Sequence, residues 1–408
     1  MVPLPSNDDV MATLRGVVDP ELGADIVELG MVNGVEVNDD GWVEVTVALT
    51  ISGCPLRVQI RDDVQSKVQG LPGVVGVKVH FGEMDQEQRS AVMQRARKSA
   101  ANRAPATEIP LTARVLAVAS GKGGVGKSSV TVNLASALAA RGFSVGVLDA
   151  DIWGFSVPRM LGIKVRLGAG EKGRIRPHEL PVGTGRLTVV SMGLVVDDED
   201  KAIMWRGLML AKALEEFLVK VAWGDLDYLL LDMPPGTGDV QMALGRILPR
   251  AEVLVVTTPA LAAQKVAVRV ADMARRSYLK VLGVIENMTA FTCDHGETYS
   301  LFGSGGGTAL AEDLGVPLIA QVPLEPEVSA ANDAGRPLSV AAPKSAAGAA
   351  FAGAADRIAD ELLPPVDMAG CTARMLATVE AALGPSGPRS GRLGPSGPRS
   401  GRLGPVQS

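Results

Sequence analysis

The chain has 408 residues, 47% hydrophobic and 21% charged, with a net charge of −5. The length suggests two or three domains, and the composition is typical of a globular protein. The charge argues against non-specific binding to nucleic acid or an anionic membrane. No apolar run reaches the ~18 residues of a transmembrane helix, and the first ten residues lack the order of a signal peptide. We therefore expect a cytoplasmic protein with no nucleic-acid or membrane partner.

Residues 1–88 are predicted to form a small α/β domain. Alternating apolar and polar residues favour strands, and polar N-caps with helical spacing favour helices. The elements expected in chain order are a helix over 7–18, a strand over 42–49, a helix over 57–68, a strand over 75–81 and a charged helix over 86–101. Pro105 and Pro110 follow, so we predict a linker over 89–112.

Residues 113–363 alternate strand-like and helix-like segments. Short continuous apolar runs are typical of strands that are covered on both faces of a parallel sheet. We expect strands at 115–119, 144–148, 228–231, 253–257 and 281–285, with a further candidate at 186–190. The predicted fold class is α/β, a parallel-sheet P-loop domain preceded by the small α/β domain.

Residues 364–408 have a different composition. The sequence GPSGPRSGRL occurs twice in succession from Gly384. Glycine, proline, serine and arginine bury too little apolar surface to offset the entropy of ordering the chain. We expect a low-complexity, disordered tail.

A glycine-rich loop follows the first of these strands and opens a helix. Its spacing fits the phosphate-binding pattern G-x-x-x-x-G-K-[ST], whose backbone N–H groups point at phosphate oxygens. We expect Lys127 to reach the β- and γ-phosphates and Ser128 to bind Mg²⁺. The predicted nucleotide-binding residues are Gly121, Lys122, Gly123, Gly124, Val125, Gly126, Lys127 and Ser128.

A second lysine, Lys122, comes directly after the first glycine of the loop. This arrangement resembles the deviant Walker A motif of the ParA, MinD and ArsA ATPases. The resemblance implies that Lys122 acts catalytically on the nucleotide of a second subunit, in a homodimer. A solvated surface lysine is the alternative.

Three aspartates follow predicted strands and complete the expected ATPase site. Residues 149–156 resemble the DADxxGPS segment of the Mrp family, with Phe155 where that pattern has proline. The resemblance implies that Asp151 orients or activates the attacking water and that Asp149 supports the magnesium shell. Asp232 ends a Walker B-like run beside the metal. Capping of loops after strands is the alternative role for each aspartate.

The segment 232–239, DMPPGTGD, follows directly. It resembles the switch of the Mrp/ApbC iron–sulfur carriers and separates them from ParA and MinD. In the same family Asn287 matches the asparagine that reads the adenine edge, although a turn asparagine is the alternative. Segments 19–22, 26–30 and 49–55 resemble a small iron–sulfur assembly domain, in which Cys54 is either a ligand or a packed side chain.

The cysteine loop of that family aligns with residues 286–296. The usual pattern is C-x-x-C, which lets a dimer supply the four thiolates of an iron–sulfur cluster. Here Cys293 is present and Gly296 replaces the second cysteine. Cys293 is the predicted ligand, and His295 and Cys371 are weaker candidates.

The resemblance implies a homodimeric ATPase that binds ATP, Mg²⁺ and a cluster, expected to be 4Fe–4S. Its expected partners are apoprotein clients and iron–sulfur assembly factors, and its expected activity is cluster transfer. Two alternatives remain. One is a ParA/MinD-type partitioning or positioning ATPase, although the Gly/Pro-rich tail cannot form a membrane helix. The other is a metal-free ATPase scaffold.

Overall fold

The computed structural model describes residues 3–19, 22–50, 57–151, 154–170, 173–194, 207–236 and 238–366. Several sequence predictions concern residues outside these ranges. They are the ligand role of Cys54, the candidate Cys371 and the tail with its two ten-residue copies.

The N-terminal domain packs helices on a three-stranded sheet of order β1-β2-β3. Strands β1 and β2 are antiparallel, whereas β2 and β3 are parallel. Val43, Val45 and Val47 alternate on the buried face of β2, because successive side chains in a strand point to opposite faces. The elements are α1 (Asn7–Leu14), β1 (Val32–Val37), β2 (Trp42–Leu49), α2 (Arg57–Gln69), β3 (Gly76–Glu83) and α3 (Gln86–Arg103).

The first helix begins as its sequence predicts and ends earlier. Ser6 and Asp9 form a capping box, in which the Ser6 hydroxyl accepts from Asp9 N at 3.2 Å and the Asp9 carboxylate accepts from Ser6 N at 2.9 Å. The helix stops at Leu14 rather than residue 18, because Gly16 N turns back to the Thr13 carbonyl. Strand β1 was not predicted, since its sequence VNGVEV contains a glycine and lacks a clear alternation.

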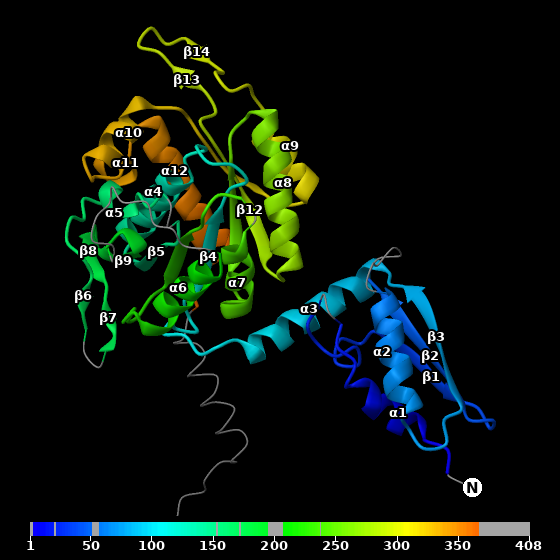
Figure 1. The fold of residues 1–408 in the computed structure, drawn as a ribbon. Coiled ribbons are helices and arrows are strands. Elements are labelled where there is room, and N and C mark those ends of the chain that lie inside the picture. Colours follow the sequence, from blue (N-terminus) through cyan, green and yellow to red (C-terminus); the bar gives the residue numbers. More distant parts are fainter. Residues whose placement is uncertain are drawn as a thin grey trace, which may run out of the picture. The chain divides into compact units, whose positions relative to one another are not determined.

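The ATPase domain is built on an eight-stranded sheet of order β15-β12-β11-β4-β10-β5-β9-β8 (Figure 1). Neighbouring strands are parallel except β8, which pairs antiparallel with β9 at the edge. The predicted parallel α/β fold is thus confirmed, with one antiparallel addition. Its strands are β4 (Arg114–Ala119), β5 (Ser144–Asp149), β8 (His178–Val182), β9 (Gly185–Ser191), β10 (Tyr228–Asp232), β11 (Glu252–Thr257), β12 (Lys280–Asn287) and β15 (Leu318–Val322).

Helices cover both faces of this sheet. They are α4 (Lys127–Ala140), α5 (Val157–Met160), α6 (Gly207–Lys220), α7 (Asp239–Ile247), α8 (Leu261–Arg276), α9 (Gly306–Leu314), α10 (Pro326–Asp333), α11 (Leu338–Ala341) and α12 (Ala346–Arg357), the last followed by a π-helical turn over Ile358–Leu362. Two small hairpins accompany them, β6 (Gly168–Ala169) with β7 (Ile175–Arg176), and β13 (Phe291–Thr292) with β14 (Thr298–Tyr299).

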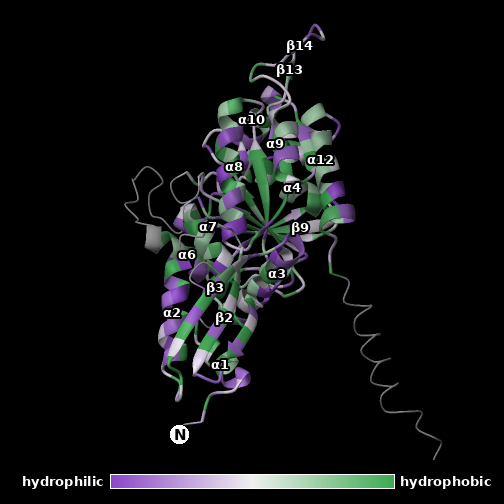
Figure 2. Cartoon of the chain, turned by 90° about the vertical axis from the view of Figure 1, so that its right-hand side faces the viewer, coloured by the Kyte–Doolittle hydropathy of each residue, from purple (hydrophilic) through white to green (hydrophobic). Residues whose placement is uncertain are grey.

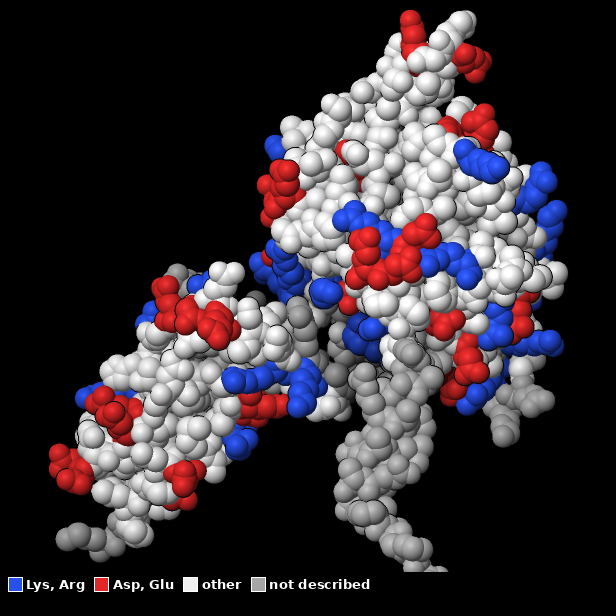
Figure 3. All heavy atoms as spheres, turned by 180° about the vertical axis from the view of Figure 1, so that it is seen from behind, with Lys and Arg blue, Asp and Glu red and all other residues white. Residues whose placement is uncertain are grey.

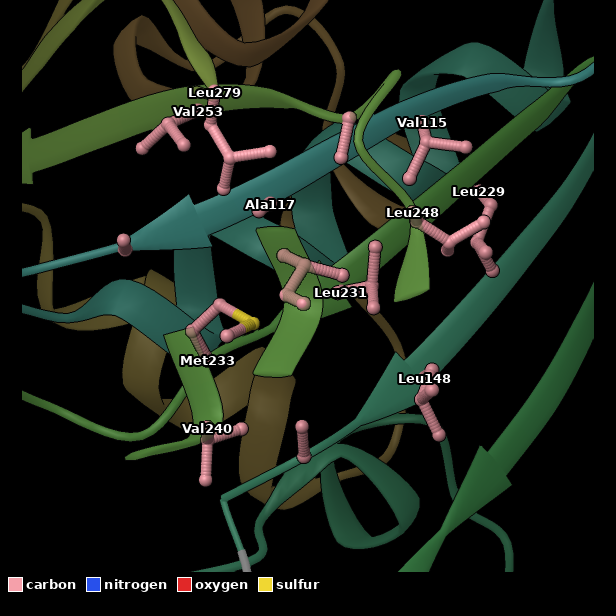
Figure 4. Packing of buried hydrophobic residues seen from close by; sticks show 14 of the residues in the cluster. Val115, Ala117, Leu148, Leu229, Leu231, Met233, Val240, Leu248, Val253 and Leu279 are labelled. Atoms are coloured by element: carbon pink, nitrogen blue, oxygen red, sulfur yellow. The ribbon is translucent and has the colours of Figure 1, made fainter. Parts of the chain in front are cut away.

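The core explains why the central strands are continuously apolar. Leu229 and Leu231 of β10 belong to one buried cluster, and Leu230 between them belongs to the cluster on the other face. Figure 4 shows Leu229 beside Leu248 and Leu231 near Met233, and Figure 2 shows the central strands in the colour of hydrophobic residues. Burying each such leucine contributes about 2 kcal/mol. Among the described residues, no helix combines the length and the apolar character that crossing a bilayer requires.

Candidate functional site

The glycine-rich loop connects β4 to α4 at the carboxyl edge of the sheet. Gly124 and Gly126 have φ angles of 80° and 78°, which side chains other than glycine rarely adopt. A Cβ at Gly126 would also collide with the Asn287 amide. Because α4 begins at Lys127, the N–H groups of its first turn face the loop, as anion binding requires.

Lys127 and Asp232 form the buried charged centre of the site. Lys127 Nζ lies 2.7 Å from Asp232 Oδ1 and 3.8 Å from Asp151 Oδ2. Asp232 is fully buried, and Lys127 is 6% exposed. The Ser128 hydroxyl donates to the second Asp232 oxygen at 2.5 Å. The predicted residues Lys127, Ser128, Asp151 and Asp232 therefore meet at one place.

Asp149 lies beside this centre because Asp149 and Asp232 are register partners on β5 and β10. Its carboxylate accepts from Asp151 N at 3.2 Å, Val157 N at 3.3 Å and the Ser191 hydroxyl at 3.0 Å. Burial, followed by the nearby charge of Asp232, raises the pKa of Asp149 to about 7. Its contacts hold the start and end of the segment 149–157.

Two hydroxyls at this centre were missed by the sequence analysis. Thr131 Oγ1 donates to Asp232 Oδ1 at 2.8 Å, and Ser191 binds Asp149. Thr131 lies four residues after Lys127, and that spacing places two helical side chains on one face. Ser191 ends β9, next to β5, so the edge shared by adjacent strand ends was the available signal.

Gln241 fixes the loop that follows β10. Its side-chain amide donates to the carbonyls of Pro234 and Gly236 at 3.0 and 2.9 Å. Gly236 N donates to the Ser120 carbonyl at 2.9 Å, and the Ser120 hydroxyl donates to the Lys122 carbonyl at 3.1 Å. A chain of hydrogen bonds thus connects α7 to the backbone of Lys122, whose side chain is exposed.

Asn287 lies at the end of β12, next to the phosphate loop. Its amide Nδ2 donates to the Val125 carbonyl at 2.9 Å. A cavity of about 240 Å³ opens beside it, adjoining Gly126. The other lining residues used below are Met288, Pro323, Leu324 and Glu325. The position, flanking the loop on one side, suits a nucleoside.

A polar network fixes the far wall of this cavity to α4. Asn332 Nδ2 donates to the Ser129 hydroxyl at 2.8 Å, and Ser339 N donates to Asn133 Oδ1 at 2.9 Å. Asn133, Asn332 and Ser339 are all buried. Helices α10 and α11 are therefore held in register with the helix that opens at Lys127.

Cys293 lies at the tip of the β13–β14 hairpin, which projects from the ATPase domain (Figure 1). Cys293 N donates to Glu297 O and Gly296 N donates to Cys293 O, each at 2.9 Å. Gly296 has a φ of 84°, so it takes the left-handed position that such a turn requires. Figure 3 shows acidic side chains at this end of the domain. No group of three potential metal ligands occurs within the described part of the chain.

Two protein-family models match this chain. Residues 112–359 match the model of the NUBPL iron-transfer P-loop NTPase family, and residues 7–79 match that of an iron–sulfur cluster assembly protein. The chain belongs to the NUBPL iron-transfer P-loop NTPase family. The resemblance to the Mrp/ApbC carriers is thereby confirmed.

Several relatives carry the description iron–sulfur cluster carrier protein. The one from Mycobacterium tuberculosis is 44% identical over 349 residues, covering 84% of this chain and 90% of the relative. The relative from Deinococcus radiodurans is 42% identical, covering 87% and 95%, and that from Bacillus subtilis is 40% identical, covering 78% and 88%. Among solved structures, a nucleotide-binding protein from Archaeoglobus fulgidus in complex with ADP is 34% identical with a TM-score of 0.48, covering 59% of this chain and 91% of that one.

Proposed function

We propose that this chain binds MgATP, hydrolyses it, and carries an iron–sulfur cluster that it passes to apoproteins. The observation that carries the ATPase part is the meeting of Lys127, Ser128 and Asp232 at the mouth of a glycine loop. Membership of an iron-transfer NTPase family, with relatives described as cluster carriers, supports the transfer part. The same relatives favour a carrier over a partitioning or positioning ATPase.

The residues fit a nucleoside triphosphate with magnesium. The loop offers backbone N–H groups, and Lys127 supplies a buried positive charge that the carboxylates of Asp232 and Asp151 balance. The Ser128 hydroxyl and the Asp232 carboxylate are oxygen donors, which Mg²⁺ prefers. When bound, the metal neutralises charge on the phosphates during phosphoryl transfer.

Side chains of the protein provide the other interactions that the proposed reaction needs. Lys127 neutralises the β- and γ-phosphate oxygens, and Asp151 orients the attacking water from its position beside Lys127. Asp149 fixes the Asp151 backbone through the bond from Asp151 N. Asn287 borders the adenine, and Lys122 completes the site of a second subunit in a homodimer.

The cluster is the cargo of the proposed reaction. Cys293 supplies one thiolate per chain, so a homodimer supplies two of the four that a 4Fe–4S cluster takes. The remaining positions are left to exchangeable thiols, His295, Cys54 or a client's own cysteines. Incomplete ligation suits a cytoplasmic carrier that receives clusters from assembly factors and releases them to apoproteins.

Anaerobic reconstitution tests this proposal. We expect about two iron and two sulfide per chain in the parent, as one 4Fe–4S cluster per dimer requires. Cys293→Ala should lose the cluster and its transfer to an apoprotein while keeping ATPase activity. Cys371→Ala is the matched cysteine control and should behave as the parent.

A second variant separates the two activities. Lys127→Ala should lose ATP hydrolysis, and Lys344→Ala, an exposed lysine, should keep it. A parent that hydrolyses ATP but holds no iron would favour the metal-free scaffold, the function that the glycine at position 296 supports. Full hydrolysis by Lys127→Ala would contradict the proposed site.

A further inference from the structure

Met288 adopts an unfavourable backbone conformation at the junction between β12 and the cysteine hairpin. Its φ is 59°, and Tyr278 is the other non-glycine residue with positive φ in the described ranges. A bulky side chain in the left-handed region is strained, and such residues persist where the surrounding contacts hold them, often at functional sites. The chain changes direction at Met288, five residues before Cys293.

On one side, this junction is attached to the phosphate loop. The adjacent Asn287 donates to the Val125 carbonyl at 2.9 Å. A Cβ built at Gly126 would lie 3.4 Å from Met288 Cε, so the methionine side chain also reaches the loop. Asn287 and Met288 both line the cavity beside Gly126. A molecule bound in that cavity can therefore contact Met288, where the chain turns.

On the other side, the junction is attached to the loop after β15. Thr289 N donates to the Val322 carbonyl at 3.1 Å, and Leu324 N donates to the Ala290 carbonyl at 2.8 Å. Leu324 lines the same cavity, as do its neighbours Pro323 and Glu325. The outgoing limb of the hairpin is thus bonded to a cavity wall.

Helix α9, which follows the hairpin in the chain, begins at the same place. Glu286 Oε1 accepts from Gly307 N at 2.6 Å, and Glu286 Oε2 accepts from the Gln321 amide at 2.7 Å. Glu286 is 1% exposed and directly precedes Asn287. The chain therefore leaves the end of β12 at Met288 to enter the projecting hairpin (Figure 1), and it returns beside the end of β12 where α9 begins.

From these contacts we infer that Met288 is a hinge through which nucleotide in the cavity sets the position of Cys293. A bound nucleoside fixes Met288 and Leu324, and an empty cavity leaves the strained residue free to relax. The two arrangements differ in their contacts with nucleotide, which is what a ligand needs to shift an equilibrium between them. Met288 is a positioning residue, and the inference rests on the proposed nucleotide-binding and cluster-carrying function.

Thiol reactivity of Cys293 tests the hinge without a cluster. In a Cys54→Ser/Cys371→Ser background, Cys293 is the sole thiol, and its alkylation by iodoacetamide is timed with and without a non-hydrolysable MgATP analogue. We expect the analogue to change the rate about 5-fold or more, the lower end of typical coupling between sites. Equilibrium dialysis measures nucleotide affinity in the same samples.

Two substitutions of Met288 distinguish the hinge from other causes of a nucleotide-dependent change in Cys293 reactivity. Met288→Gly removes the left-handed strain and, with the analogue at a concentration that saturates the variant by dialysis, should reduce the response to less than about 2-fold. Met288→Leu is the matched control, because leucine keeps a bulky side chain in the strained left-handed region, and it should keep most of the response. If dimerisation alone changed the rate of Cys293 alkylation, the change would persist in Met288→Gly.

The outcomes separate this inference from the proposed function. A parent that binds nucleotide and carries a cluster, but whose Cys293 reactivity ignores nucleotide, overturns the hinge alone. A full response in Met288→Gly does the same. A parent that binds no nucleotide contradicts the proposed ATPase function and the hinge with it.

Discussion

At the scale of single residues, Asp149 has an unusual proton affinity for an aspartate. Its carboxylate is fully buried, and Asp232 lies next to it in the sheet. Desolvation first, and then the charge of Asp232, raises its pKa from 3.8 to about 7. Native protein therefore binds this proton more tightly than unfolded chain between these two pH values.

The direction of the resulting pH effect follows from linkage. Stabilisation from Asp149 is fully present below about pH 4 and is lost as the pH rises through about 7. Asp149→Asn keeps a neutral side chain at every pH. Relative to the parent, we expect the free energy of unfolding of the variant to increase by on the order of 2–4 kcal/mol as the pH rises from 5 to 8, since each unit of pKa shift corresponds to about 1.4 kcal/mol.

Thermal unfolding of nucleotide-free protein at pH 5 and pH 8 measures this difference. Asp313→Asn, an exposed aspartate on α9, is the control and should leave the pH dependence of the parent unchanged. If the difference in stability between Asp149→Asn and the parent were equal at both pH values, Asp149 would be ionised at both.

At the scale of elements, α7 holds the loop after β10 through a single side chain. Gln241 is 6% exposed and donates to two carbonyls of that loop. Gln241→Leu removes both bonds while keeping a similar volume. Because the loop is bonded through Ser120 to the backbone of Lys122, we expect kcat for ATP hydrolysis to fall about 10-fold or more, since misplacement near a reacting group is costly.

The KM for ATP should change little in this variant, because Lys127 and the glycine loop remain in place. Steady-state ATPase kinetics separate the two constants. Gln264→Leu serves as a matched control, since Gln264 also donates to a loop carbonyl, that of Pro259, but on α8. A raised KM with unchanged kcat would indicate that Gln241 supports nucleotide binding instead.

The sequence predicted those elements whose surroundings are uniform along their length. Strands β4, β5, β10, β11 and β12 are buried on both faces, so their apolar runs are continuous and visible. Strand β8 contains Glu179 and Pro181 because it is an edge strand, and β15 contains the exposed Gln321. Edges and short hairpins depend on tertiary neighbours, which a local pattern does not contain.

The residues of the candidate site were likewise only partly predictable from the sequence. Asp149, Asp232 and the loop were predictable because each follows an apolar run in parallel strands whose ends share one edge. The bonds of Thr131 and Ser191 were not, because they join residues 101 and 42 positions apart in the sequence. The bonds of Gln241 span five and seven residues but depend on the conformation of the loop after β10. The strained φ of Met288 has no signature in residue type at all.

At the scale of the whole molecule, the proposed homodimer makes the exposed Lys122 a shared residue. Each active site would combine Asp151 and Lys127 from one chain with Lys122 from the partner chain. Lys122→Ala and Asp151→Ala should each lose most ATP hydrolysis as pure proteins. Lys122→Ala should keep nucleotide affinity better, because Lys127 and the loop backbone belong to the same chain as the bound phosphates.

Mixing the two inactive variants tests this arrangement. In a two-fold symmetric dimer, a hybrid contains one site with a wild-type Asp151 and a wild-type Lys122, and one site that lacks both. Random exchange of equal amounts makes half of the dimers hybrids, so about a quarter of the parental activity should return. Light scattering with nucleotide present checks that dimers form. Confirmed subunit exchange without recovered activity would place Lys122 outside the partner's site, and the lysine would then act on its own chain or not at all.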